Sequence, residues 1–210
     1  MLIANISPRT GGKTTNSGWM SHALQETGEE VEGFDADHSF QFHSWSQRGG
    51  FTFPVQKTAS AKFHTEIKNS ADKIGIIDCG HTENHPDITD SVLRIADLVI
   101  IHMAPTKADF DRIVEPNDKV TIRDMIRRSA ALRDDATPPP AWVLLNRAVS
   151  GAKSTDYYRT EMKEEGFQVL TTTIPRSEMY AQSIGFPVQG ASKGVFGELI
   201  TELKTRGLMR

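Results

Sequence analysis

The sequence contains a single cysteine, Cys79, among 210 residues. An internal disulfide framework is therefore excluded, and a reducing compartment is expected. Long apolar runs are also lacking: no stretch approaches the roughly 18 residues of a membrane span, and the first run, residues 2–6, is too short for a secretory signal. The net charge is only −3, which does not favour a protein that binds nucleic acid as a monomer. We expect one cytoplasmic domain over residues 1–210, in which any DNA contact comes from a local patch or from several subunits together.

What the sequence does contain is a regular alternation of two patterns. Seven apolar runs have strand length, at residues 2–6, 31–34, 51–55, 73–78, 98–103, 142–146 and 169–174. Several are continuous rather than alternating, which is typical of parallel strands buried on both faces. Between them, apolar residues recur at helical spacing, at 19–24 before a closing Gly28, at 122–126 and at 195–203. The alternation predicts an α/β fold with a doubly wound, mostly parallel sheet flanked by helices.

Directly after the first apolar run comes a glycine-containing loop, residues 7–15 (SPRTGGKTT). Glycines let the backbone turn tightly, so that successive N–H groups converge on phosphate oxygens at the start of a helix. In such a loop Lys13 supplies the charge for the β- and γ-phosphates, and the Thr14 hydroxyl binds Mg²⁺. The usual pattern is G-x-x-x-x-G-K-[ST], and Ser7 stands where its first glycine belongs. The alternative is a Gly-Gly turn with a surface lysine, which the position of the loop directly after a buried strand disfavours.

Carboxylates end two of the predicted strands. One segment, Phe34-Asp35-Ala36-Asp37, contains two of them, and another, Ile76-Ile77-Asp78-Cys79-Gly80, contains Asp78. An apolar run that closes on aspartate and then glycine is a Walker B pattern, in which the aspartate holds a water bound to Mg²⁺. Strands also end in aspartate simply because the chain turns there. The order of the two segments after a phosphate loop favours the metal-binding function over that alternative.

This order of motifs resembles the ParA/MinD group of P-loop ATPases, the branch with a deviant Walker A, and most closely its ParA-like partition proteins. The resemblance covers nearly the whole chain. Besides the loop and the two acidic segments, it rests on Ala4-Asn5, Thr14-Thr15, Trp45, Ala96-Asp97-Leu98-Val99-Ile100, Pro105, Asp109, Leu144-Leu145-Asn146-Arg147, Thr173-Ile174-Pro175-Arg176 and residues 180–187.

The resemblance implies a P-loop NTPase fold that binds ATP or ADP together with Mg²⁺. The implied nucleotide-binding residues are Arg9, Thr10, Gly11, Gly12, Lys13, Thr14 and Thr15 around the phosphates, and Asn146 and Pro175 beside the base. The implied metal set is Thr14, Asp37 and Asp78, and the implied catalytic residues are Lys13, Asp78 and a water-orienting Asp37. The resemblance further implies that ATP closes two subunits into a homodimer, and that a ParB-like partner stimulates slow hydrolysis. Such a dimer binds DNA without sequence preference.

One residue departs from the family pattern. The signature lysine, which reaches the phosphates of the partner subunit, should lie at Pro8, which carries no charge. Arg9 either replaces it, because a guanidinium suits phosphate oxygens, or simply faces solvent. Two functions therefore stay open besides a partition or cargo-positioning ATPase. One is an ATP-dependent synthetase of the dethiobiotin or cobyrinate type, and the other is a nucleotide-binding regulator that hydrolyses little.

Basic residues and histidines offer further candidate contacts. Two basic groups are candidates for DNA binding, the first being Arg123, Arg127, Arg128 and Arg133, and the second Lys193, Lys204, Arg206 and Arg210. Acidic neighbours dilute both groups, so a solvated face is the favoured interpretation of each. No long basic amphipathic helix of the MinD type follows, so membrane attachment is not expected. His38 and His81 follow the two acidic segments, where a contact with phosphate or with the attacking water is an open alternative.

Overall fold

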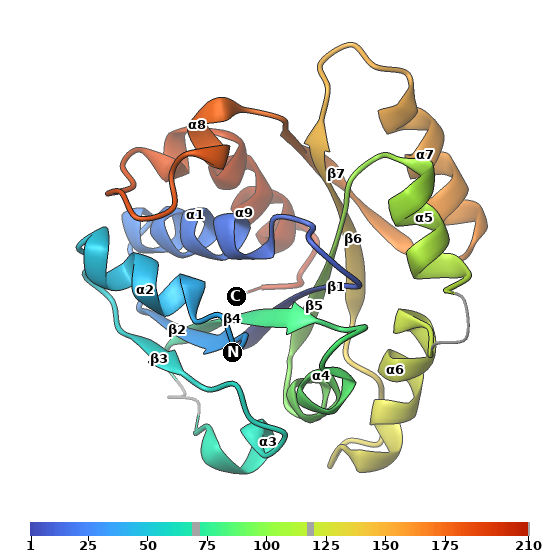
Figure 1. The fold of residues 1–210 in the computed structure, drawn as a ribbon, viewed down its shortest axis with the longest axis horizontal. Coiled ribbons are helices and arrows are strands. Elements are labelled where there is room, and N and C mark those ends of the chain that lie inside the picture. The colour runs from blue at the N-terminus through green and yellow to red at the C-terminus, as the bar shows by residue number, and fades with distance from the viewer. Residues whose placement is uncertain (69–71, 117–119, 210) are drawn as a thin grey trace.

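The computed structural model describes residues 1–68, 72–116 and 120–209, and its centre is a seven-stranded sheet (Figure 1). The strands are β1 (Leu2–Ser7), β2 (Val31–Ala36), β3 (Val55–Lys57), β4 (Ile74–His81), β5 (Leu98–Met103), β6 (Ala141–Ala148) and β7 (Gln168–Pro175). Their order across the sheet is β3-β2-β4-β1-β5-β6-β7, and every neighbouring pair is parallel. The predicted doubly wound, parallel α/β fold is confirmed.

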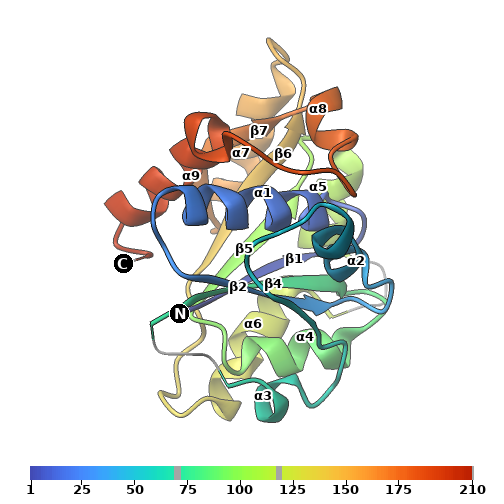
Figure 2. The same ribbon diagram turned by 90° about the vertical axis from the view of Figure 1, so that its left-hand side faces the viewer.

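Helices cover both faces of the sheet (Figure 2). They are α1 (Lys13–Glu26), α2 (Gln41–Arg48), α3 (Phe63–Glu66), α4 (Pro86–Leu93), α5 (Lys107–Val114), α6 (Ile122–Ser129), α7 (Ser154–Glu164), α8 (Glu178–Ala181) and α9 (Val195–Thr205), with short 3-10 turns η1 (Ala130–Leu132) and η2 (Ala191–Lys193). One apolar core joins α1, α2 and α9 to the sheet through residues such as Trp45 and Phe196. The other core joins α3, α4, α5, α6 and α7 to the sheet, and Val92 is one of its members. Ile3 and Ala4 are consecutive residues of β1 but belong to different cores. No helix among the described residues has the length and apolar character that crossing a lipid bilayer requires.

The predicted helices are present, and the predicted strands are found with bounds shifted by up to three residues, except in one place. Strand β5 has the predicted bounds, and α1 ends at Glu26 with Gly28 in the left-handed region at φ 93°, as the sequence indicated. The predicted strand at 51–55 is wrong, because only Val55 belongs to β3. Pro54 has no N–H for a strand ladder. The apolar side chains of Phe51 and Phe53 instead pack against each other outside the sheet, with 5.1 Å between their ring centroids.

The strand order places several loops at one edge of the sheet. Strand β1 lies between β4 and β5, so the connections on its two sides run in opposite directions, which creates a crevice at the carboxyl ends of the strands. Because all strands are parallel, the loops after β1, β2, β4, β6 and β7 open at that same edge. The motifs predicted from the sequence therefore meet there.

His22 lies in the second half of α1, away from this edge, and makes the stability of the folded protein depend on pH. Its ring packs against Phe51, with 4.4 Å between ring centroids, and against Phe53. The residue is only 8% exposed, and Nε2 has no hydrogen-bond partner among the described residues. Burial lowers the pKa of His22 from 6.5 to about 4. The unfolded chain therefore takes up a proton at a pH where the folded chain does not, and stability is lost as the pH falls from about 6.5 towards 4.

Replacing His22 by Leu should remove this part of the acid sensitivity. As the pH falls from 7 to 4, the difference in the free energy of unfolding between the His22→Leu variant and the wild type should shift by about 2 to 3 kcal/mol in favour of the variant. Urea titrations of both proteins at several pH values measure the difference. Comparing the two proteins cancels the contributions of all other titrating groups, so parallel pH profiles would show that His22 charges freely in the folded state.

Candidate functional site

The loop that follows β1 is shaped as an anion-binding turn. Gly12 has φ 80° and ψ 21° at the N-cap of α1, and a Cβ at this position would lie 2.5 Å from Asn146 Nδ2. Both features favour glycine at this position. In the described structure no side chain caps the first turn of α1, so its N–H groups are available to an anion. This is the geometry that the predicted phosphate site needs.

Lys13 points into this loop rather than into solvent. The residue is 5% exposed, and its Nζ donates hydrogen bonds to Ser7 Oγ at 3.0 Å and to Arg9 O at 3.1 Å. The alternative of a surface lysine is therefore excluded. Burial lowers the pKa of Lys13, while the charge of Asp78 opposes that shift. Because both hydrogen-bonded acceptors are neutral, the buried ammonium favours an anion beside it.

Two carboxylates from neighbouring strands lie behind the loop. Asp35 on β2 and Asp78 on β4 are register partners, and both are buried. Burial, followed by the charge of Asp35, raises the pKa of Asp78 to about 7. Burial likewise raises the pKa of Asp35 to about 6. The surrounding protein does not fully compensate the negative charges of the ionised carboxylates, and a bound divalent cation would provide that compensation.

Asp78 also has an unused acceptor position. Its Oδ1 accepts a hydrogen bond from Ser17 Oγ at 3.3 Å, whereas the buried Oδ2 has no hydrogen-bond partner among the described residues. The Thr14 hydroxyl lies near that carboxyl and lowers its pKa, against the larger raising effect of burial. Nowhere in residues 1–68, 72–116 and 120–209 do three His, Cys, Asp or Glu side chains form a metal site by themselves. The buried Asp78 Oδ2 and the nearby Thr14 hydroxyl fit Mg²⁺, which usually takes one or two protein ligands together with phosphate oxygens and water.

The two carboxylates of the acidic segment after β2 have different environments. Asp35 supports the turn, because its carboxylate accepts hydrogen bonds from the backbone N–H of Asp37 at 3.2 Å and of His43 at 2.8 Å. Asp37 is half-buried, and its carboxyl carbon lies 3.5 Å from where a Cβ on Gly80 would be. The Asp37 carboxyl group therefore lies beside Gly80, near the end of β4. The water-orienting role of Asp37 stays a prediction.

A cavity of about 480 Å³ adjoins the phosphate loop. Its lining residues are Gly12, Thr15, Asn16, Ala104, Thr106, Asn146, Arg147, Val149, Ile174, Pro175, Arg176, Ser177, Tyr180 and Ala181. The cavity thus brings the loop residues Gly12 and Thr15 together with Asn146 and Pro175, which are distant in the sequence. Asn146 Nδ2 donates a hydrogen bond to Gly11 O at 2.5 Å, which ties the end of β6 to the loop.

Replacing Asn146 by Ala should weaken ADP binding by about tenfold, because the loop loses this tie and the predicted base site loses a polar group. Calorimetric titration with ADP and Mg²⁺ measures the change. Val149, 54% exposed on the rim of the same cavity, provides a matched control, since Val149→Ala removes no polar contact. Equal affinities for the Asn146→Ala variant and the wild type would place the base elsewhere.

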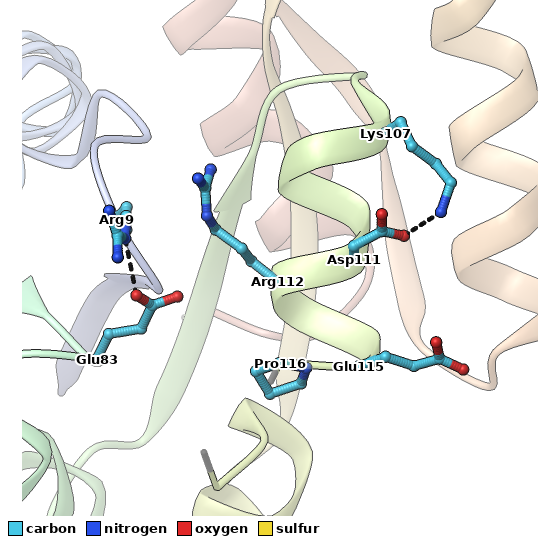
Figure 3. Close-up of a pocket in the computed structure, with 7 residues that line it drawn as sticks. All are labelled: Arg9, Glu83, Lys107, Asp111, Arg112, Glu115 and Pro116. Atoms are coloured by element: carbon cyan, nitrogen blue, oxygen red, sulfur yellow. Dashed lines mark hydrogen bonds and ion pairs between the residues drawn. The ribbon is translucent and has the colours of Figure 1, made fainter. Parts of the chain in front are cut away.

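The Arg9 side chain lines a different hollow from this cavity, and Figure 3 shows that hollow. Its Nε pairs with Glu83 Oε2 at 2.7 Å, and Glu83 lies in the loop after β4. The two residues line a second hollow of about 480 Å³, towards which Arg112 extends from α5. The guanidinium is therefore held by a neighbouring loop in this conformation, and its contact with phosphate across a dimer stays a prediction.

The remaining residues around the loop include one that the sequence interpretation missed. Arg147 has φ 55° and donates from Nη1 to Thr10 O at 3.4 Å, so it braces the loop from β6. The only indication of this role in the sequence was that Arg147 follows Asn146 at the end of a strand that resembles the family pattern. His81 Nε2 lies 3.4 Å from Thr10 Oγ1, whereas the ring of His38 packs against that of His85.

The two basic groups are largely compensated by carboxylates. The pairs are Arg123–Glu165, Arg127–Asp124, Arg128–Asp90, Arg133–Asp135, Lys204–Glu29 and Arg206–Glu202. Arg210 lies outside the described residues. Exposed pairs of this kind support the interpretation of two solvated faces, because their positive charges are already matched.

Comparison with known proteins adds the fold family. No family profile and no curated protein matches the sequence. A variant of McdA from Cyanothece, in complex with ATP, shares 15% identity at a TM-score of 0.70, covering 100% of this chain and 97% of that chain. A protein described as a putative plasmid partition protein from Borrelia burgdorferi B31, bound to AMPPNP, shares 13% identity at a TM-score of 0.70, with 98% of each chain covered.

Cobyrinic acid a,c-diamide synthase from Mycobacterium smegmatis, with a bound ATP analogue and magnesium, shares 14% identity at a TM-score of 0.63. This match covers 98% of this chain and 96% of the synthase chain. At these identities the similarity shows the fold alone. The chain has the fold of the ParA/MinD-type P-loop ATPases, as the order of its motifs indicated.

Proposed function

We propose that this protein is a ParA-like ATPase that binds ATP and Mg²⁺ and acts in plasmid or chromosome partition, or in positioning other cargo. The observation that carries the proposal is the junction of three features at one edge of the sheet. These are a left-handed Gly12 before an uncapped helix, a buried Lys13 inside the loop, and, within the described residues, Asp78 with an unpartnered buried oxygen. The neighbours that hold ATP, AMPPNP or an ATP analogue with magnesium support the same assignment. We also treat residues 1–210 as one ATPase domain.

Each residue of the site has a distinct task in this function. The N–H groups from Gly11 to Thr15 and the Lys13 ammonium bind the phosphates, and Asn146 and Pro175 flank the base. Thr14 and Asp78 hold Mg²⁺, which neutralises phosphate charge when bound. Asp37, opposite Gly80, orients the attacking water. We also propose that hydrolysis is slow and that a ParB-like partner stimulates it.

We further propose that ATP closes two copies of the chain into a homodimer. The phosphate loop lies at an open edge of the sheet, and Arg9 on that edge is held by an ion pair with Glu83. Exchanging this pair for a phosphate of the partner subunit would compensate for the uncharged Pro8. Since the basic residues on α6 and α9 are paired with carboxylates, any contact with DNA depends on surfaces that the two subunits form together.

Measuring the molecular mass in solution tests this function directly. Light scattering should show a monomer with ADP and a dimer with a non-hydrolysable ATP analogue and Mg²⁺. The dimer should be retained on duplex DNA at low salt and released as the salt concentration rises, because counterion release drives binding without sequence preference.

The same measurement separates the alternatives. A monomer with both nucleotides that ignores DNA would favour a synthetase of the cobyrinate type, for which the structural similarity to the diamide synthase is the specific support. A dimer that forms with the analogue but shows no measurable turnover would favour a regulator that hydrolyses little.

A further inference from the structure

A chain of buried polar side chains runs beneath the phosphate loop. Asn16 Nδ2 lies 2.9 Å from His102 Nδ1, and His102 Nε2 lies 2.8 Å from Asn5 Oδ1. Asn5 Nδ2 donates to Ser17 Oγ at 2.9 Å, and Ser17 Oγ donates to Asp78 Oδ1 at 3.3 Å. All five residues are at most 3% exposed. The chain therefore links the C-terminal end of β5 to the metal-binding carboxylate on β4 through β1 and α1.

Every hydrogen bond in this chain runs in the same direction. Because Asn5 gives its amide hydrogens to Ser17, its carbonyl oxygen faces His102 and requires a proton on Nε2. Asn16 then donates to the unprotonated Nδ1. A second ring proton would face the Asn16 amide hydrogens, so the arrangement fits only a neutral imidazole. Burial, followed by the charge of Lys13, lowers the pKa of His102 to about 3, which agrees with that geometry.

The position of His102 connects the chain to the loop itself. Its backbone oxygen lies 3.2 Å from where a Cβ on Gly11 would be, so the strand passes directly under the phosphate loop. Its side chain reaches Asn16 in the first turn of α1, one turn after Lys13. Displacing the imidazole would therefore move the start of α1 and the support of Asp78 at the same time.

We propose that His102 is a positioning residue that fixes the start of α1 and the Asp78 carboxylate relative to each other, so that both face the same phosphate and Mg²⁺. The proposal rests on the proposed ATPase function. Imidazole suits this place because it offers one donor and one acceptor on opposite sides of a rigid ring. The nearby ammonium of Lys13 disfavours a charged group at this position.

Three substitutions and a matched control test the proposal. His102→Leu removes both hydrogen bonds, His102→Gln keeps one donor and one acceptor, and Ser17→Ala cuts the last link to Asp78. His22→Leu is the control, because His22 is also a buried histidine and lies on α1 itself, but it takes no part in the hydrogen-bonded chain. Hydrogen exchange of the nucleotide-free proteins, Mg²⁺–ADP titrations, and kcat and KM for ATP are measured in each, with thermal unfolding as the measure of stability.

We expect His102→Leu to speed exchange of the amides at residues 11–17 by about tenfold and to lower kcat by about 10- to 100-fold, since small misplacements are costly in a preorganised site. His102→Gln should recover part of both effects, and His22→Leu should show neither. Ser17→Ala should raise the Mg²⁺ concentration needed for half-maximal ADP binding. The kcat of the double variant with His102→Leu and Ser17→Ala should be only slightly lower than that of the more impaired single variant, because both substitutions break the same hydrogen-bonded chain.

Two results would overturn the proposal. In one, His102→Leu unfolds at a lower temperature but keeps the exchange rates at residues 11–17, the Mg²⁺ dependence and kcat of the wild type, so that His102 only stabilises the core. In the other, the effects of His102→Leu and Ser17→Ala multiply, so that the two residues act separately. If the wild type itself neither binds nor hydrolyses ATP, the proposed function fails, while the exchange rates of the nucleotide-free proteins still decide whether His102 holds the loop.

Discussion

Replacing Lys13 by Ala should abolish tight ATP binding, lowering the affinity by about 100-fold or more, which corresponds to about 3 kcal/mol. The Lys13 ammonium lies inside the loop, where it contacts two neutral oxygens and no solvent competes strongly for it. In such surroundings a hydrogen bond from a charged donor to phosphate is stronger than the same contact at the surface. Isothermal titration with ATP and Mg²⁺ measures the loss.

The control for this prediction is Lys107→Ala. Lys107 is an exposed lysine on α5 that pairs with Asp111, so its removal changes the net charge equally without touching the loop. Its ATP affinity should match that of the wild type. Undiminished binding by the Lys13→Ala variant would mean that the loop after β1 does not bind the phosphates, and the proposed function would then have no site.

Replacing Asp37 by Ala should have the second large effect, on turnover rather than on binding. We expect kcat to fall by about 100-fold while the affinity for ATP changes by less than about threefold. Asp37 lies beside Gly80 at the end of β4, where its Oδ1 accepts a hydrogen bond from the backbone N–H of Ser39 at 3.1 Å, and we expect the carboxylate held in this way to orient a water. The variant should therefore remain in the ATP-bound dimer long after the wild type has returned to the monomer.

Single-turnover hydrolysis together with light scattering checks both parts. Asp134→Ala is the control, because it removes an exposed carboxylate from the loop before β6. Turnover at the wild-type rate in the Asp37→Ala variant would assign the water-orienting role to another group. Loss of ATP binding in that variant would instead show that Asp37 mainly organises the loop after β2.

Much of the fold follows from local patterns in the sequence. The run 98–103 became β5 with the same bounds, because continuous apolar residues suit a strand covered by helices on both faces. The segment 51–55 shows the limit of that reasoning. Its phenylalanines are buried against one another and against His22 rather than in a strand, and composition alone does not distinguish these two kinds of burial.

The residues of the candidate site also fall into two groups, those that the sequence predicts and those whose contacts only the structure reveals. Lys13, Thr14 and Asp78 stand in motifs whose spacing indicates their chemistry, and the structure brings them together. The ion pair of Arg9 with Glu83 joins residues 74 positions apart. No local pattern predicts it. For His102 the only signal was a single histidine in an apolar run, which more often indicates an ordinary core residue.

By itself the sequence determined that a glycine turn precedes a helix after the first strand, and that acidic residues end two others, because these features depend on neighbours along the chain. Only the tertiary structure decided which side chains share a buried environment. The parallel order β2-β4-β1-β5 sets Asp35 beside Asp78 and His102 beneath Gly11. The pKa shifts, the Asp78 oxygen left unpartnered among the described residues and the direction of the hydrogen-bonded chain all arise from that burial, since desolvation depends on every element packed around a group.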